Sequence, residues 1–347
     1  MSKQIFAAVA VAACGFAAAA QADTAITENT TVGGKAYVDL TSLDKKAAGV
    51  KAATSGVGLD VTRFYLVVNH TFDSVWSANL TTDFNYVSAD ASKETQLFVK
   101  KAYLQAKISD AFWVRAGSAD LPWIPFVEDL YGYRYVEKIL ADRTSRGTSA
   151  DWGVHIGGKL VDGKLGYALS AIEGNGYKNP TRSKTLDFEG RVSFVPVSGL
   201  TAAVGFYRGK LGNDFEGTVT PAVHTATRFD ALLAYAHEGV RVGGEYFTAD
   251  NWTAVTKTAT DKSDGFAVWG SYRFSDLVSG FLRYDNEKPN KNTAPTLKDE
   301  YYNIGATFKP RKAVDLSVAY KRDEQKNNTA VKPLESDEFG IWAQVAF

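Results

Sequence analysis

The feature that most constrains the fold is an alternation of apolar and polar side chains with a period of two residues. Trp76, Leu80 and Phe84 alternate with polar residues, and the same pattern recurs at residues 186–194 and 314–321. Successive side chains of a β-strand point to opposite faces, so each segment predicts a strand with one apolar and one polar face. Soluble sandwiches also contain such strands, so strand number and connections must decide the architecture.

Sixteen such segments occur, and their connections alternate strictly between short and long. The predicted strands begin near Gly34, Val57, Val75, Glu94, Ala111, Asp151, Lys164, Thr185, Leu200, Thr225, Val240, Asp264, Leu277, Lys298, Val314 and Asp337. The short connections hold Asp, Gly, Pro and Ser, as tight hairpins require, whereas the long ones are polar. A sandwich has no reason to sort its loops in this way, but an outer-membrane barrel does.

The predicted fold class is therefore all-β, a transmembrane antiparallel β-barrel of sixteen strands. In lipid every backbone amide must be satisfied within the protein, so the sheet has to close on itself. Sixteen strands leave a water-filled lumen, whereas the interior of a barrel of about eight strands is filled by its own side chains. After the N-terminal segment no stretch approaches the ~18 uninterrupted apolar residues that a membrane helix needs. The 39 basic and 39 acidic residues give no reason to expect nucleic acid as a partner.

The N-terminal residues 1–22 are expected to be a secretory signal peptide, which leaves residues 23–347 as the barrel. Lys3 supplies the positive start, an apolar stretch follows, and Ala20-Gln21-Ala22 fits the cleavage pattern of small residues. Lipoprotein processing at Cys14 is the competing interpretation. Cleavage after Ala22 would remove the only cysteine, leaving no thiol to be oxidised in the periplasm.

The last predicted strand and the central part of the chain carry resemblances to known families. Phe339, Ile341, Ala343 and Val345 alternate and end in Phe347, which resembles the C-terminal signal read by the bacterial barrel-insertion machinery. The overall layout resembles the sixteen-stranded trimeric porins. A stretch of about sixty residues is also similar to the phosphate-selective porin O and P family. It comprises Trp113-Val114-Arg115-Ala116-Gly117, Pro122, Pro125, Glu128, Asp151-Trp152-Gly153-Val154, Gly158-Lys159-Leu160 and Gly163-Lys164-Leu165-Gly166-Tyr167-Ala168-Leu169.

These resemblances imply a passive channel in the Gram-negative outer membrane, surrounded by lipid and assembled as a homotrimer. The third long connection, at about residues 119–150, is the longest and is expected to fold into the barrel and narrow it. Small hydrophilic solutes or anions would pass. No lysine or arginine ladder matches that of the phosphate-selective porins, so their selectivity is not carried over to this chain. A channel selective for phosphate or another oxyanion is the alternative hypothesis. A non-conducting adhesin or structural barrel is a third hypothesis.

The faces assigned by alternation predict a slight excess of positive charge in the lumen. The basic set has thirteen members, namely Lys35, Arg63, Lys101, Lys107, Arg115, Lys159, Lys164, Arg191, Arg228, Arg241, Arg273, Arg283 and Lys321. The acidic set has ten, namely Asp39, Asp83, Asp151, Asp187, Glu189, Asp230, Glu245, Asp285, Asp315 and Glu338. Charges that line a pore select permeant ions, so this difference predicts a mild anion preference. The alternative is that the charges only wet the lumen wall.

The candidate pore-lining residues come from the early strands and the third long connection. The early strands contribute Lys35, Arg63, Lys101 and Arg115, and the connection contributes Glu128, Asp129, Arg134, Lys138, Arg143 and Arg146. In general-diffusion porins acidic loop residues face a basic wall, which implies a transverse field here. Alternatively, the mixed loop charges pair among themselves and anchor the loop to the wall. Aromatics of the loop either stack sugars or, more simply, pack it against the wall. Lys100 falls on the apolar face of its strand, which indicates a subunit interface or a misjudged register.

Enzymatic and cofactor chemistry is not expected. His70, His155, His224 and His237 are scattered without the spacing of metal ligands. No phosphate-binding loop, dinucleotide-binding fingerprint or nucleophile elbow occurs. The sequence thus predicts a channel without metal or cofactor.

Overall fold

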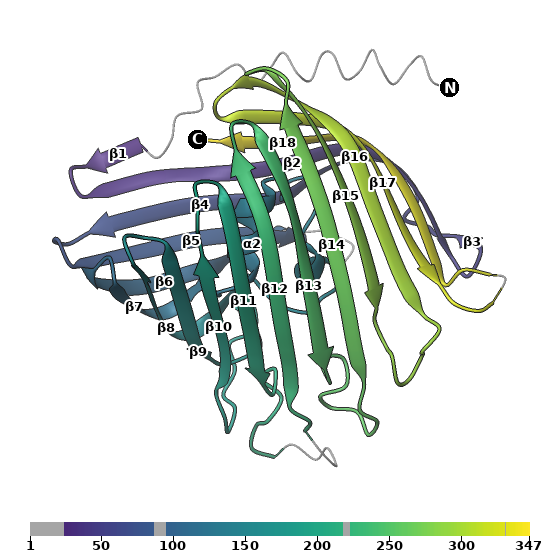
Figure 1. The fold of residues 1–347 in the computed structure, drawn as a ribbon, viewed down its shortest axis with the longest axis horizontal. Coiled ribbons are helices and arrows are strands. Elements are labelled where there is room, and N and C mark those ends of the chain that lie inside the picture. The colour runs from purple at the N-terminus through teal and green to yellow at the C-terminus, as the bar shows by residue number, and fades with distance from the viewer. Residues whose placement is uncertain (1–23, 87–94, 218–222, 330) are drawn as a thin grey trace.

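The chain folds into one closed antiparallel barrel in the computed structural model, which describes residues 24–86, 95–217, 223–329 and 331–347. Sixteen long strands are present among these residues (Figure 1). They are β2 (Thr30–Ala47), β4 (Gly56–Thr71), β5 (Trp76–Tyr86), β6 (Thr95–Ser109), β7 (Phe112–Asp120), β8 (Ala150–Leu160), β9 (Leu165–Ile172), β10 (Asp187–Phe194), β11 (Leu200–Gly209), β12 (Ala226–His237), β13 (Val240–Asp250), β14 (Lys262–Arg273), β15 (Val278–Lys288), β16 (Lys298–Arg311), β17 (Val314–Lys326) and β18 (Leu334–Ala346). The prediction of a sixteen-stranded antiparallel barrel is confirmed. The predicted signal peptide lies outside the described residues, as does the second long connection at residues 87–93.

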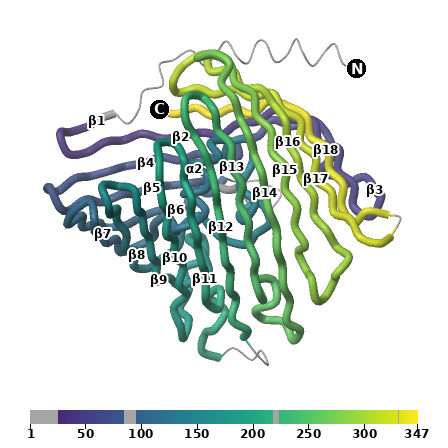
Figure 2. The backbone as a smooth tube through the Cα atoms, viewed as in Figure 1, coloured from purple at the N-terminus to yellow at the C-terminus, as the bar shows by residue number. Residues whose placement is uncertain are grey.

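The barrel closes where its last long strand meets its first. Strand β18 pairs with β2 from Leu334↔Ala47 to Ala346↔Lys35, and Figure 2 shows these two ends of the chain side by side. Two short strands that the sequence did not predict, β1 (Thr24–Thr27) and β3 (Val50–Lys51), pair with β2. Closure satisfies the backbone of every long strand from both sides, as an apolar solvent requires.

The predicted strand starts agree closely with the observed ones, and the largest difference is four residues, between Gly34 and Thr30. The next largest is at β18, which begins at Leu334 rather than Asp337. A run of polar residues from Glu335 to Glu338 hides the alternation there. The long connections therefore lie at one end of the barrel and the short turns at the other, as predicted, within the described parts of the chain.

The exposed and buried faces of the strands are reversed relative to a soluble protein. On β10 the outward Phe188 and Val192 are 44% and 48% exposed, whereas the neighbouring Asp187 and Glu189 are 0% and 1% exposed. Charged groups are almost never fully buried unless they are paired. An apolar exterior with a polar interior indicates that lipid surrounds the barrel and water enters it. Among the described residues, no helix is both long and apolar enough to cross a membrane.

The third long connection, residues 121–149, turns into the lumen after β7 and carries two helices, α2 (Ile124–Tyr131) and α3 (Leu140–Arg143). Figure 1 shows α2 inside the barrel. A proline lies at the start of α2, and the helix ends at Gly132, whose φ of 80° suits glycine. The buried side chains of the connection, including Trp123, Ile124 and Tyr131, join one cluster with inward-facing wall residues. The wall part of the cluster includes Ala203, Leu232, Ala234, Phe247, Ala267, Trp269 and Phe281. We call residues 121–149 the inserted loop.

Candidate functional site

A three-way ion pair attaches the inserted loop to the wall formed by the later strands. Arg143 of α3 lies 3.0 Å from Asp285, 2.7 Å from Asp299 and 3.4 Å from Asp323. These carboxylates come from the consecutive strands β15, β16 and β17, so one guanidinium group joins three strands to the loop. The Arg143 side chain is only 9% exposed, which makes this a largely desolvated contact.

Further contacts extend this attachment from β10 to β17. Arg146 pairs with Glu287 at 2.6 Å, and Lys321 approaches Glu137 at 3.4 Å. Burial acts to raise the pKa of Glu137, but Lys321, the Lys138 backbone N–H and nearby arginines outweigh it and lower that pKa to about 2. Other wall side chains bind the loop backbone. They are Glu189 to the Trp123 N–H, Arg191 to the Pro122 carbonyl, Arg228 to the Arg146 carbonyl, Arg241 to the Asp129 and Leu130 carbonyls, Glu245 to the Leu140 N–H and Arg283 to the Lys138 carbonyl.

Three of these wall acids, Glu287, Asp299 and Asp323, were missing from the predicted lumen set. The alternation contained the signal, because Asp299 has the same parity as the inward Tyr301, and Asp323 the same parity as Lys321. All three lie near strand ends, where the alternating segments run into the polar connections. Three additional acids, against one additional cation, Lys100, remove most of the predicted surplus of three cations, thirteen against ten. An anion preference must therefore rest on how the charges are arranged rather than on their total.

The loop's own charges partly pair with one another, as the alternative interpretation held. Arg134 lies 2.5 Å from Glu128 and 3.5 Å from Asp142, and Lys138 lies 3.6 Å from Asp142. Burial raises the pKa of Glu128, although Arg134 opposes this effect. The loop therefore presents a mixed charged surface whose cations and acids are within contact of each other.

Asp129 instead faces basic groups of the early strands. Burial raises the pKa of its carboxyl group, while the positive charges of Lys35, Lys101 and Arg241 act in the opposite direction. Lys35 on β2 is exposed, and it has the same parity as the inward Tyr37. Lys101 on β6 lies 2.9 Å from Asp120. An acidic side chain of the loop and basic side chains of the early wall thus lie within electrostatic reach of one another.

The remaining two wall candidates differ in position. Arg63 on β4 is 2.9 Å from Asp83 on β5, in the middle of the wall. Arg115 lies on β7, only three residues after the strand starts at Phe112, and is therefore close to a short turn. Its guanidinium group lies 4.4 Å from the centre of the Trp113 ring and 4.8 Å from that of Tyr103. The structure therefore places Lys35 and Lys101 within electrostatic reach of Asp129, although the direct partner of Lys101 is Asp120, and it gives Arg63 and Arg115 other partners.

Lys100 points inward, which corrects its assignment to the apolar face. Thr81 pairs with Lys101 whereas Thr82 pairs with Val99, so Lys100 is the extra residue of a β-bulge in β6. A bulge shifts the parity of the side chains that follow it. The Lys100 ammonium group lies 3.4 Å from the Tyr65 hydroxyl, a side chain of the inner wall. The register explanation therefore holds, with the bulge as its cause.

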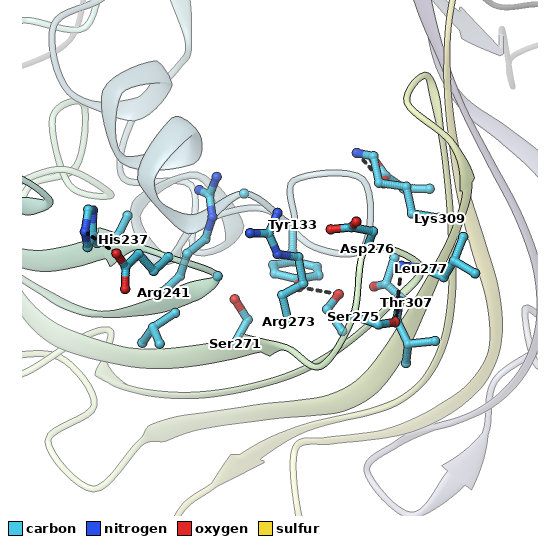
Figure 3. A pocket seen from close by; sticks show the side chains of 18 of the residues that line it. Tyr133, His237, Arg241, Ser271, Arg273, Ser275, Asp276, Leu277, Thr307 and Lys309 are labelled. Carbon is cyan, nitrogen blue, oxygen red and sulfur yellow. Dashed lines mark hydrogen bonds and ion pairs between the residues drawn. The ribbon is translucent and has the colours of Figure 1, made fainter.

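The inserted loop separates two cavities in the lumen. One, of about 390 Å³, lies on the side of the long connections between the loop and residues 174–179. The other, of about 430 Å³, lies on the side of the short turns (Figure 3). Figure 3 shows Arg241, Arg273 and Tyr133 around it. Loop aromatics such as Tyr131 and Tyr135 are 2% and 5% exposed, so they mainly pack the loop against the wall.

The described residues contain no group of histidine, cysteine and carboxylate side chains arranged to hold a metal ion. A family model described as Gram-negative porin matches residues 7–329. No curated protein matches the sequence significantly.

Solved structures share the barrel over nearly the whole chain. The anion-selective porin from Comamonas acidovorans is 12% identical, with 92% of this chain and 99% of that chain covered and a TM-score of 0.67. The outer membrane channel DcaP of Acinetobacter baumannii is 13% identical, with 94% and 100% covered and a TM-score of 0.64. The trimer form of OmpT, an outer membrane protein of Vibrio cholerae, is 14% identical, with 94% and 100% covered and a TM-score of 0.60. At these identities the likeness concerns the fold.

Proposed function

The chain belongs to the Gram-negative porin family, and we propose that it forms a passive, water-filled path for small hydrophilic solutes with a mild preference for anions. As a porin it is an outer-membrane channel. The observation that carries the proposal is that the polar attachment of the inserted loop lies on one side of the barrel. Hydrogen bonds and ion pairs from β10 to β17 hold the loop on that side, whereas on the early wall Tyr37 of β2 packs near it, with its ring 6.3 Å from that of Tyr135. We place the permeation path between the loop and the remainder of strands β2 to β7.

Charges across this path support the preference for anions. Lys35, Lys100 and Lys101 come from the early wall, and Lys100 was absent from the predicted lumen set. The inserted loop contributes Asp129 within reach of Lys35 and Lys101, and Glu128 within reach of Lys100, which would create a transverse field that favours polar over apolar solutes. The structurally similar Comamonas porin is described as anion-selective, which is consistent with the proposal. In this proposal the inserted loop is the constriction of the channel.

Assembly is part of the same proposal. We infer a homotrimer surrounded by outer-membrane lipid, supported by the trimer form of the similar Vibrio OmpT. Phe347 exchanges backbone hydrogen bonds with Gly34, and its ring lies 5.9 Å from that of Phe64 at the seam of the barrel. This terminal residue would serve as the insertion signal before it seals the barrel. Export would depend on cleavage of the signal peptide near Ala22.

The first test is the reversal potential of the purified protein in planar bilayers under a potassium chloride gradient. We expect stable conductance and a chloride-to-potassium permeability ratio above unity, because the path is lined by the basic early wall. A preference for potassium would contradict the anion part of the proposal. Block of the chloride current by inorganic phosphate alone would favour an oxyanion-selective channel instead. Absence of conductance would favour the non-conducting structural or adhesin barrel.

The second test concerns the oligomer. Unheated protein in mild detergent should migrate as a trimer and convert to the 37.7 kDa range or slightly below after heating. The outward faces of the strands are apolar, so they can be covered either by lipid or by a second copy. Native mass spectrometry that shows only single chains at bilayer-active concentrations would contradict the trimer.

A further inference from the structure

The inward-facing arginines of the strands fall into two groups that differ in their partners. The predicted basic lumen set contains seven arginines, and three of them have carboxylate partners. These three are Arg63 with Asp83, Arg228 with Glu189 and Asp230, and Arg283 with Asp285. The other four form no ion pair with a carboxylate in the described part of the chain. They are Arg115, Arg191, Arg241 and Arg273.

The four arginines without acidic partners all lie at the end of the barrel that carries the short turns. Arg115 is three residues after the start of β7, and Arg191 is three residues before the end of β10. Arg241 is the second residue of β13, and Arg273 is the last residue of β14. We call these four side chains the arginine arc, because they extend along the rim from β7 to β14. Every path through the lumen leaves the barrel at this rim, whichever side of the inserted loop it follows.

Neutral groups hold two arginines of the arc in place. Arg115 Nε donates to the side-chain oxygen of Gln105 at 2.7 Å, beside the two aromatic rings described above. Arg191 Nε donates to the Pro122 carbonyl at 2.8 Å, and its guanidinium group lies 3.6 Å from the centre of the Phe126 ring. Such contacts position a guanidinium group without neutralising its charge, and arginine stays protonated in proteins.

The other two arginines of the arc line the cavity on the side of the short turns, where Figure 3 shows both. Arg241 Nη1 donates to the carbonyls of Asp129 and Leu130, at 3.0 Å and 3.2 Å. These carbonyls belong to the last turn of α2, and the C-terminal end of a helix favours a cation. Arg273 is exposed in the cavity. Both side chains therefore bring a full positive charge to the same water-filled space.

The described acids at this end of the barrel are either paired with lysines or exposed in turns. Asp315 pairs with Lys309 at 3.0 Å, and Asp110 pairs with Lys107 at 2.7 Å. The remaining ones are exposed turn residues, namely Asp73, Asp162, Glu238 and Asp276. Water and salt screen such exposed charges. Charge is therefore sorted along the barrel axis, with ion pairs at the level of the inserted loop and a positive arc at the rim.

We propose that the arginine arc makes conduction through the barrel depend on direction. This inference rests on the proposed channel function and names residues that determine its selectivity at one mouth. Fixed charge of one sign beside low-dielectric walls raises the local concentration of counter-ions. Anions therefore accumulate at the mouth on the side of the short turns. The channel carries more current when anions enter past the arc than when they leave past it, and the arc drives no net transport without a gradient or a voltage.

The experiment is a comparison of currents at the two polarities in planar bilayers with the same salt on both sides. With potassium chloride at about 0.1 M, we expect about twofold more current when the side of the long connections is positive, because anions then enter past the arc. At about 1 M the screening length falls to ~3 Å, so the two currents should become equal. Equal currents at the lower concentration would overturn the inference. Asymmetry that persists at the higher one would also overturn it, because a charge effect would be screened.

A thiol placed in the arc changes the charge within a single folded channel. Cys14, the only cysteine in the sequence, lies in the predicted signal peptide, so Arg273→Cys gives the mature protein one reactive thiol. Its thiolate displaces methanesulfinate from a methanethiosulfonate reagent and forms a disulfide with the rest of the reagent. A reagent that carries a trimethylammonium group should restore the asymmetry, and one that carries a sulfonate should abolish it. The chamber from which the reagents act faster identifies the side of the short turns. Equal effects of the two reagents would refute the arc.

The matched control removes an ion pair from the same mouth. Lys309→Gln with Asp315→Asn deletes one positive and one negative charge, so the asymmetry should be unchanged. Arg115→Gln with Arg273→Gln deletes two positive charges, so the asymmetry should fall by about half. Neither of these arginines forms a hydrogen bond or an ion pair with the inserted loop, so the loop should stay attached. Heat-modifiable migration on gels checks that each variant is folded.

The reversal potential under a salt gradient reports separately on the proposed function. An anion-selective channel with equal currents at both polarities would keep the proposed function and overturn the arc. A potassium-selective channel whose asymmetry depends on Arg273 would support the arc and refute the anion preference. A barrel without conductance would refute both.

Discussion

Arg143→Ala is expected to release the inserted loop from the wall and turn a steady current into one with frequent transitions between conductance levels. The substitution leaves Asp285, Asp299 and Asp323 close together without the cation that joins them. Removing one partner of a buried ion pair costs roughly 3–5 kcal/mol, because the other charge stays buried. The hydrogen bonds between strands are untouched, so the barrel should remain folded while the loop moves. Single-channel recording measures the transitions, and limited trypsin digestion measures access to the loop.

Two further variants define this expectation. Lys51→Ala removes an ion pair with Asp44 whose side chains are 66% and 50% exposed, and such pairs contribute little, so the current should stay quiet. Arg143→Lys keeps the charge but loses the planar fork that contacts several carboxylates at once, so an intermediate effect is expected. Arg143→Ala recordings as quiet as those of Lys51→Ala, with the loop still resistant to trypsin, would refute the role of Arg143 as the anchor.

The barrel itself was predictable because two solvents act on every strand. Lipid outside and water inside impose the same alternation on each segment, and the pattern at Phe188 and Glu189 shows both selections at neighbouring positions. Connection length supplied the second constraint, because a connection of two residues such as Glu238-Gly239 can only join two neighbouring antiparallel strands in a tight turn. The prediction weakened where these pressures end, at the polar strand end that precedes Asp337. The short strands β1 and β3 lie beyond the alternating segments and gave no signal.

The candidate site was less predictable, because it depends on contacts between distant parts of the chain. The sequence indicated that Arg143 and Arg146 belong to the inserted loop, but not that they face the wall of β14 to β17. Lys100 was misplaced because a bulge adds one residue and reverses the parity beyond it. Lys178, which lines the cavity on the side of the long connections, lies in a connection without periodicity, where nothing in the sequence relates it to the lumen. The pore-lining role of the ten candidates stays a prediction.

The double variant Arg63→Gln with Lys101→Gln is expected to reverse the ion preference from anions to cations. Each lysine or arginine removed leaves its partner behind, Asp83 or Asp120, so the path loses two positive charges and gains two uncompensated carboxylates. Fields in a narrow lumen are screened over ~10 Å at 0.1 M salt, so the reversal potential should be measured at or below that ionic strength. The expected result is a reversal potential of opposite sign to that of the wild type.

A companion variant separates charge from shape. Adding Asp83→Asn and Asp120→Asn to the double variant removes the two unpaired acids as well, and should return the reversal potential toward the wild-type value. It also relieves the burial of an unpaired Asp83, whose side chain is fully buried, so a folding defect of the double variant should disappear with it. Lys107→Gln is the control outside the constriction, because Lys107 pairs with Asp110 at an exposed short turn. If the double variant keeps the wild-type reversal potential while Lys107→Gln does too, the early wall does not set the selectivity and the path must run elsewhere in the lumen.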